Sequence, residues 1–113
     1  MSQNISTTVN ITNGIATFNY HPEGIINVTQ ESDVIFSLSA ECSPAVSFKQ
    51  PLTAYIPIDA TKDVTPNLSS DGQSLTLSDS DIDQETICIQ LVVEDAHGNQ
   101  YASPDPRMVN YPR

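Results

Sequence analysis

Basic residues are scarce in this 113-residue chain. Lys49, Lys62, Arg107 and Arg113 stand against 14 Asp and Glu residues, which leaves a formal net charge of −10. A surface of this sign repels the phosphate backbone of nucleic acids. The sequence also lacks the basic amphipathic helix that would hold an anionic membrane. We therefore expect neither nucleic acid nor membrane among the partners of this protein.

Long apolar runs are absent as well. No stretch approaches the roughly 20 apolar residues that a membrane-spanning helix needs. The N-terminal sequence has neither the basic n-region nor the apolar h-region of a secretory signal peptide. We expect a cytoplasmic protein, or a mature form from which a leader has been removed. The length suits a single domain over residues 1–113.

Cysteine is limited to Cys42 and Cys88. No CxxC motif or Cys/His cluster indicates a zinc site. In an oxidising compartment the two thiols could bridge two sheets, but without a signal peptide we expect two buried free thiols. His21 and His97 both lie beside turn residues, where solvent-exposed histidines are common, and we expect no metal ligand there.

The usual catalytic and cofactor motifs are missing too. The sequence contains no GxSxG elbow, no P-loop and no GxGxxG fingerprint. The acidic run Asp79–Glu85 suggests calcium, but an EF-hand loop needs Gly and Glu where this chain has Gln84 and Gln90. We interpret these acids as solvated or as turn caps, and expect no cofactor.

What the sequence does contain is alternation of polar and apolar residues. Residues 8–12 and 15–20 alternate on either side of Asn13-Gly14, the dipeptide best suited to a type I′ turn, and predict a β-hairpin. Shorter strands are predicted for residues 25–28, 34–39 and 74–77. Thr86–Glu94 is the strongest, with one face formed by Ile87, Ile89, Leu91 and Val93.

Proline divides residues 41–67 into short pieces, of which Val46–Phe48 and Ala54–Ile58 are expected to be edge strands. No apolar stripe of helical period is long enough for a helix. The sequence therefore predicts an all-β fold, an immunoglobulin-like sandwich of about seven or eight short antiparallel strands.

Asp105-Pro106 is the chemically distinctive peptide bond of the chain. An Asp carboxyl can attack its own main-chain carbonyl to form a five-membered ring, and the proline nitrogen leaves readily once it is protonated. A neighbouring acid or phenol could supply that proton, and a rigid scaffold would supply the effective molarity. The alternative is an ordinary Pro-Asp-Pro turn that closes the last strand.

The string Ser103-Pro104-Asp105-Pro106, followed by Val109-Asn110 and Pro112, resembles the DP-EP family of small bacterial proteins. The resemblance extends loosely over most of the chain. It implies a β-sandwich that acts as an aspartic-type peptidase on its own polypeptide chain.

The resemblance also implies site residues. Asp105 matches the motif aspartate, as nucleophile or general acid/base, and Tyr20 matches an N-terminal tyrosine that donates a proton or stabilises an oxyanion. By its position in the sequence, Asp33, or failing that Glu31, would be the second acid. Its negative charge would raise the pKa of Asp105 and so keep a proton in the site near neutral pH.

Two other functions remain open. The segment from Leu77 to Asn99 is similar to bacterial immunoglobulin-like or fibronectin-like domains, which are non-catalytic binding or assembly modules. The third alternative is a structural homo-oligomer built through the proline-broken edge strands. The lack of a leader and the single-domain length favour self-processing over adhesion.

Overall fold

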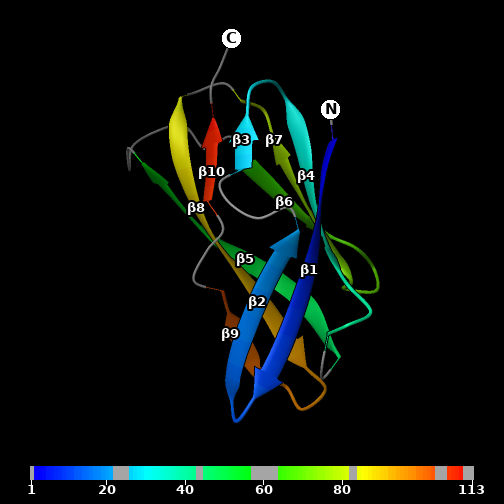
Figure 1. Ribbon diagram of the computed structural model, residues 1–113. Coiled ribbons are helices and arrows are strands. Elements are labelled where there is room, and N and C mark those ends of the chain that lie inside the picture. Colours follow the sequence, from blue (N-terminus) through cyan, green and yellow to red (C-terminus); the bar gives the residue numbers. More distant parts are fainter. Residues whose placement is uncertain are drawn as a thin grey trace.

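Two β-sheets face one another in the computed structural model, which describes residues 2–21, 26–42, 45–56, 64–81, 84–103 and 107–110 (Figure 1). The first sheet has the strand order β2-β1-β4-β7-β6, and the second has β3-β10-β8-β5, with β9 also paired to β8. The described residues form ten strands and no helix: β1 (Ser2–Thr12), β2 (Ile15–His21), β3 (Ile26–Val28), β4 (Ser32–Leu38), β5 (Val46–Ile56), β6 (Val64–Leu68), β7 (Ser74–Asp79), β8 (Glu85–Asp95), β9 (Gln100–Ala102) and β10 (Arg107–Asn110).

The predicted β-hairpin is confirmed. β1 and β2 pair antiparallel, and the two residues between them have positive φ angles, 54° at Asn13 and 77° at Gly14. Two successive positive φ angles define a type I′ turn, whose twist matches that of the flanking strands. A short local signal was therefore enough to define this hairpin.

The core lies between the two sheets and is formed by alternate residues of the strands. The predicted inner face of β8 is confirmed, because Ile87, Ile89, Leu91 and Val93 are at most 1% exposed. The first sheet contributes residues such as Phe36, at 0% exposure. Burying a side chain of this size stabilises a fold by about 1.5–3 kcal/mol. The other members of the core are Ile5, Val9, Ile26, Val28, Val34, Val46, Phe48, Val64, Leu75, Leu77 and Met108.

The all-β sandwich is thus confirmed, but the strand count and the pairing need correction. The described part of the chain has ten strands, not seven or eight. β1 pairs parallel to β4, and β10 pairs parallel to β3, so the sheets are not purely antiparallel. Alternation in a sequence identifies a strand, but it does not reveal which distant strand will lie beside it.

The proline-rich middle of the chain is more regular than predicted. The first expected edge segment and residues 54–56 of the second are parts of one strand, β5, whose register against β8 shifts between Lys49 and Leu52. Residues 57 and 58 of the second segment lie outside the described residues. β5 is an edge strand of the second sheet, as expected. β6 was not predicted as a strand. It contains Pro66, and proline is tolerated there because β6 lies at the edge of the first sheet.

A tight turn links the two sheets. The Gly72 carbonyl accepts a hydrogen bond from the Phe48 N–H at 2.7 Å, between the β6–β7 turn and β5. Gly72 has a φ of +71°, and a Cβ at this position would lie 2.9 Å from the Cβ of Ser47. Only glycine meets both requirements without strain.

The two cysteines are free and partly buried. The prediction of free thiols is confirmed, whereas full burial is not. Cys42 lies over the first sheet, where its Sγ accepts a hydrogen bond from the Val9 N–H at 3.3 Å. Cys88 lies in β8, in the second sheet.

Candidate functional site

Two strands, β9 and β10, follow one another along the same edge of β8 (Figure 1), and the distinctive proline-rich motif stands between them in the sequence. β9 pairs Ala102 with Val92, and β10 pairs Arg107 with Cys88. Between these two pairs the chain has four residues, 103–106, whereas β8 has three, 89–91. The chain therefore has one residue more than β8 between the two pairs, so its register against β8 shifts by one residue between Ala102 and Arg107.

The extra residue inverts the burial pattern. Before the motif, the odd-numbered Tyr101 and Ser103 face the core, and after it the even-numbered Met108 does so. A one-residue register shift has this effect because neighbouring side chains of a strand point to opposite faces. Both Ser103 and Met108 are 0% exposed, so the chain is held in the core on either side of the motif.

Ser103 anchors the first side of the motif through both its main chain and its side chain. The Ser103 N–H donates to the Leu91 carbonyl at 2.9 Å. In return, the Leu91 N–H donates to the Ser103 hydroxyl oxygen, also at 2.9 Å. In a regular antiparallel ladder that second bond would end on a main-chain carbonyl. The serine side chain thus takes over a ladder position immediately before Pro104.

Of the residues predicted to carry the chemistry, one, Asp105, lies in this region of the sequence. Asp105, with its neighbours Pro104 and Pro106, lies outside the described residues. The structure defines what flanks them: Ser103 on one side and the main chain of Arg107 on the other.

Tyr20 lies in β2, where it pairs with Thr7 of β1. Its ring packs against the core and meets the ring of Phe36 edge-on, with 6.3 Å between the centroids and 73° between the planes. Because Phe36 is fully buried, the Tyr20 side chain lies on the inner face of the first sheet. That face is turned toward the second sheet, to which Ser103 is hydrogen-bonded.

Asp33 lies on the opposite face of the same sheet. It is exposed, while its neighbour Val34 is buried in the core. Asp33 pairs with Ser2 of β1 and Tyr20 with Thr7, five residues farther along. At about 3.3 Å per residue this separates the two positions by about 16 Å along the strand. The structure does not bring Asp33 and Tyr20 together.

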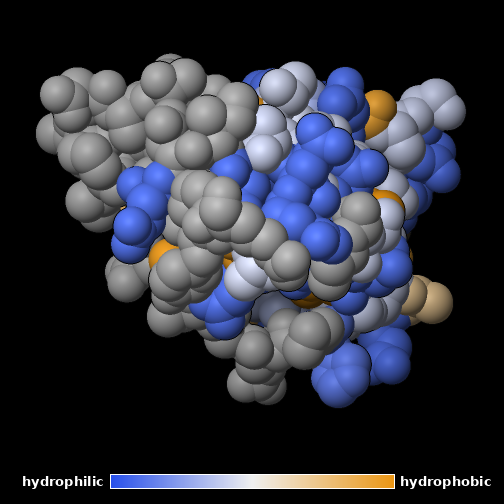
Figure 2. All heavy atoms as spheres, turned by 90° about the horizontal axis from the view of Figure 1, so that it is seen from above, coloured by the Kyte–Doolittle hydropathy of each residue, from blue (hydrophilic) through white to orange (hydrophobic). Residues whose placement is uncertain are grey.

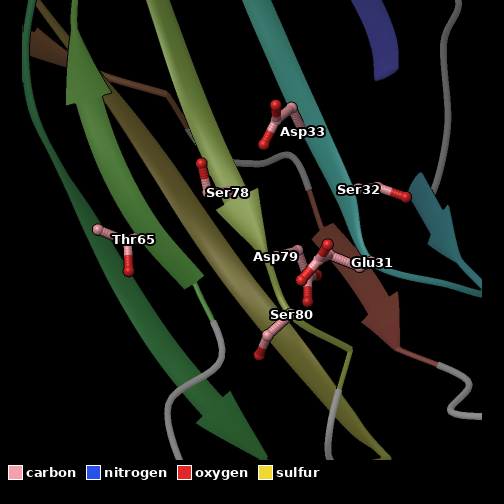
Figure 3. Close-up of a pocket in the computed structure, with 7 residues that line it drawn as sticks. All are labelled: Glu31, Ser32, Asp33, Thr65, Ser78, Asp79 and Ser80. Carbon is pink, nitrogen blue, oxygen red and sulfur yellow. The ribbon is translucent and has the colours of Figure 1, made fainter. Parts of the chain in front are cut away.

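Both candidates for the second acid line a pocket of about 390 Å³ at one end of the sandwich, close to the ends of β4 and β7 (Figure 3). The pocket is lined by acids and hydroxyls: Glu31, Ser32, Asp33, Thr65, Ser78, Asp79 and Ser80. Figure 2 views the molecule from this end, where the coloured residues are mostly hydrophilic.

The acidic run after β7 includes a turn cap. The Asp79 carboxylate accepts a hydrogen bond from the Asp81 N–H at 2.8 Å, and both side chains are buried, at 1% and 7% exposure. Of the two interpretations of this run, turn capping is the one confirmed for Asp79. Among the residues that the structure describes, no group of three or more His, Cys, Asp or Glu could hold a metal ion.

The two histidines lie at exposed positions, as expected. His21 ends β2, and His97 lies in the turn between β8 and β9. The His97 N–H donates to the Asp95 carboxylate at 2.9 Å, which stabilises that turn. Neither histidine belongs to the motif region.

Sequence reasoning named the motif but missed the role of Ser103 and the extra residue. The sequence did contain a signal for the extra residue, because the core-facing position is odd-numbered at Tyr101 and even-numbered at Met108. Strand prediction misses this change because it treats the two strands as separate segments. The Ser103 hydroxyl carried no signal, since its partner is a main-chain group of another strand.

The comparisons with known proteins agree with the motif. The family model described as the DP-EP family matches residues 3–112, nearly the whole chain. A search of the curated proteins found no match. Within the described residues there is also no helix long and apolar enough to cross a membrane.

Proposed function

The chain belongs to the DP-EP family, and from that membership and the anchored motif we propose that it is a self-processing peptidase of the aspartic type. The bond cleaved is Asp105–Pro106, and the substrate is the protein's own polypeptide chain. The alternative is a non-catalytic immunoglobulin-like module for binding or assembly, in which the motif serves only to place the last strand.

One observation carries the proposal: the chain is hydrogen-bonded to β8 at Ser103 and paired with it again at Arg107, the described residues on either side of the motif, in registers that differ by one residue. Ser103 and Leu91 exchange two hydrogen bonds, and Arg107 pairs with Cys88. Fixing both ends of a chain segment lowers its conformational entropy. A restricted reactant reacts faster because it has already lost most of the entropy that the transition state requires.

The proposed reaction needs no cofactor. A carboxylate oxygen of Asp105 attacks the main-chain carbonyl carbon of the same residue and forms a five-membered cyclic anhydride. The bond to the Pro106 nitrogen breaks, and that nitrogen takes a proton as it leaves. Water then opens the anhydride, so that one water is consumed and the products are residues 1–105 and 106–113.

Tyr20 is the proposed source of the proton. Its side chain lies on the inner face of the first sheet, which is turned toward the second sheet, where β9 and β10 lie. A phenol is a suitable general acid when it is held in place, and the edge-on contact with Phe36 holds the ring. Asp33 is on the outer face of the first sheet, on the side opposite to Tyr20, and its role as the second acid beside Asp105 stays a prediction.

We propose that the reaction takes place in the cytoplasm, the compartment expected from the sequence.

The product peptide is expected to stay in the sheet. It contains β10, which lies between β3 and β8 and carries the fully buried Met108. It also carries Arg107 and Arg113, two of the four basic residues of an otherwise acidic chain. Cleavage must therefore be assayed under denaturing conditions, since a native separation would show an unchanged particle.

The test is intact-mass spectrometry of purified protein over several days at mildly acidic pH. We expect two fragments, 1–105 and 106–113, from the folded protein and none from Asp105→Ala. Asp-Pro bonds also break slowly in unfolded chains at acidic pH. The matched control is therefore the same protein in concentrated urea at the same pH. An intact folded chain, or equal cleavage in urea, would leave the binding or assembly module as the better function.

A further inference from the structure

The edges of the two sheets are not equally protected. β5 carries Lys49, Pro51 and a register shift, and β6 carries Pro66. β3 and β9 have three residues each. Charged residues, prolines, irregularities and short length all discourage another strand from pairing with an edge. These four edges therefore resist the addition of a strand.

β2 has none of these features. It is seven residues long, IATFNYH, and within the part of the chain that the structure describes its ladder partner is β1 (Figure 1). Every second residue of an edge strand directs its N–H and C=O away from the sheet. Ile15 of this strand is 70% exposed, against 41% for Leu68 of β6. An edge of this kind is a template for strand pairing.

The charge distribution points to the same strand. Residues 1–22 contain no Asp, Glu, Lys or Arg, so all 14 acids and all four bases lie in residues 23–113. Two molecules with a net charge of −10 each repel one another at most approaches. The β1–β2 hairpin, residues 2–21, is a region where two copies can touch without placing acid against acid.

We propose that the protein forms a homodimer in which β2 pairs antiparallel with β2 of a second copy. A two-fold axis beside Phe18 would place Thr17 opposite Asn19 of the second copy and Ile15 opposite its His21. Each strand then meets its own uncharged sequence, as a two-fold interface requires. The two five-stranded first sheets become one continuous sheet of ten strands, five from each copy.

A second copy fits this edge better than an unrelated extended peptide. A cationic peptide would be drawn to the acidic remainder of the surface rather than to an uncharged strand, and an anionic one would be repelled by the molecule as a whole. The uncharged strand of another copy meets neither obstacle. The Ile15 side chains of the two copies would lie at opposite ends of the shared ladder, and each would lose solvent exposure there.

The test is the mass in solution of the full-length protein, by light scattering or sedimentation. We expect twice the 12.3 kDa of the chain, and a dimer that becomes tighter as added salt screens the repulsion between the two acidic bodies. A monomer at concentrations up to about 1 mM would overturn the proposal.

Charge variants test the strand and its register. Thr17→Glu with Asn19→Glu places acid opposite acid across the two-fold axis and should weaken the dimer by about tenfold or more. Thr17→Lys with Asn19→Glu places opposite charges there and should restore it. The matched control, Thr65→Glu with Asn67→Glu, adds the same charge to exposed positions of β6, the other edge of the same sheet, and should leave the dimer intact.

Two outcomes of the variant series would count against the interface. If the β6 variant dissociates the dimer as strongly as the β2 variant, the effect is one of net charge. If both β2 variants remain dimeric with unchanged affinity, another surface forms the contact. Neither result depends on whether the chain cleaves itself.

Discussion

Ser103 and Leu91 exchange two hydrogen bonds, each 2.9 Å long, and one of them ends on the serine side chain. The bond from the Leu91 N–H to the Ser103 hydroxyl replaces a main-chain bond at the last position before Pro104. The ladder of β9 can therefore end here without leaving the Leu91 N–H unpaired, and from Arg107 the chain pairs with β8 in a register shifted by one residue.

Ser103→Ala is expected to lower both stability and the rate of self-cleavage. The Leu91 N–H would be left unpaired in a buried position, which costs about 1–3 kcal/mol. One anchor of the motif would loosen, and we expect cleavage to slow by about tenfold. Urea denaturation and intact-mass time courses measure the two effects. Ser6→Ala, at an exposed position of β1, is the control and should change neither.

Tyr20→Phe removes the phenolic hydroxyl and keeps the aromatic ring. The edge-on contact with Phe36 is retained, so we expect the aromatic packing of the side chain to be unchanged. Loss of the proposed proton donor should slow cleavage by about a hundredfold or more. Tyr101→Phe is the matched control, since Tyr101 is also partly buried against the core. If both variants cleave at the wild-type rate, Tyr20 has no part in the reaction.

Asp33→Asn should leave the cleavage rate within about twofold of wild type, because Asp33 faces solvent on the side of the first sheet opposite to Tyr20. The measurement is the same mass time course, with Glu31→Gln run in parallel. A tenfold loss in either variant would restore that acid to the site, and the geometric argument from the strand faces would be wrong.

Local signals in the sequence predicted what is local in the structure. Asn13-Gly14 defined a hairpin because the turn requires two positive φ angles, and the alternation from Ile87 to Val93 defined the inner face of β8. Neither signal depends on distant residues. The all-β class followed from many such segments.

What the sequence did not predict depends on distant partners. β1 pairs with β4 in parallel, and nothing within either strand specifies that neighbour. Pro66 argued against a strand, yet β6 is stable because it occupies an edge. For the candidate site, the motif named Asp105, but the register shift beside it becomes visible only when Ala102 and Arg107 are both placed on β8.

The turn before β7 should make stability depend on acid pH. The Ser69 hydroxyl donates to the Asp71 carboxylate at 2.6 Å and the Gln73 N–H donates at 3.0 Å. These bonds, that from Ser69 first, lower the pKa of Asp71 below its ordinary value of 3.8. A carboxyl with a lowered folded pKa stabilises the fold above its ordinary pKa, and this is lost as the pH falls through the folded pKa.

Asp71→Asn should therefore be less stable than wild type at neutral pH, and the difference should narrow below about pH 4. Urea midpoints measured at a series of pH values give the result. Glu41→Gln, an exposed carboxyl on another turn, is the control for the loss of one negative charge. A difference between Asp71→Asn and wild type that is the same at every pH would show that the carboxylate bonds do not titrate with folding.

Thr7 and Thr8 are neighbours on β1 whose hydroxyls are in opposite situations. Thr7 is 0% exposed, and its Oγ1 has no hydrogen-bond partner among the residues that the structure describes. The Thr8 Oγ1 lies 2.7 Å from the Ser39 hydroxyl. A buried hydroxyl without a partner costs about 1–3 kcal/mol, whereas a paired one stabilises the fold by about 1 kcal/mol.

Thr7→Val is therefore expected to stabilise the protein by about 1 kcal/mol, and Thr8→Val to destabilise it by a similar amount, as measured by urea denaturation. The cleavage rate decides what the Thr7 hydroxyl is for, because Thr7 pairs directly with Tyr20. If Thr7→Val is more stable and cleaves normally, the hydroxyl is a packing defect. If it is more stable and cleaves slowly, the fold has kept an unpaired hydroxyl beside Tyr20 at the expense of stability, as is common at catalytic sites.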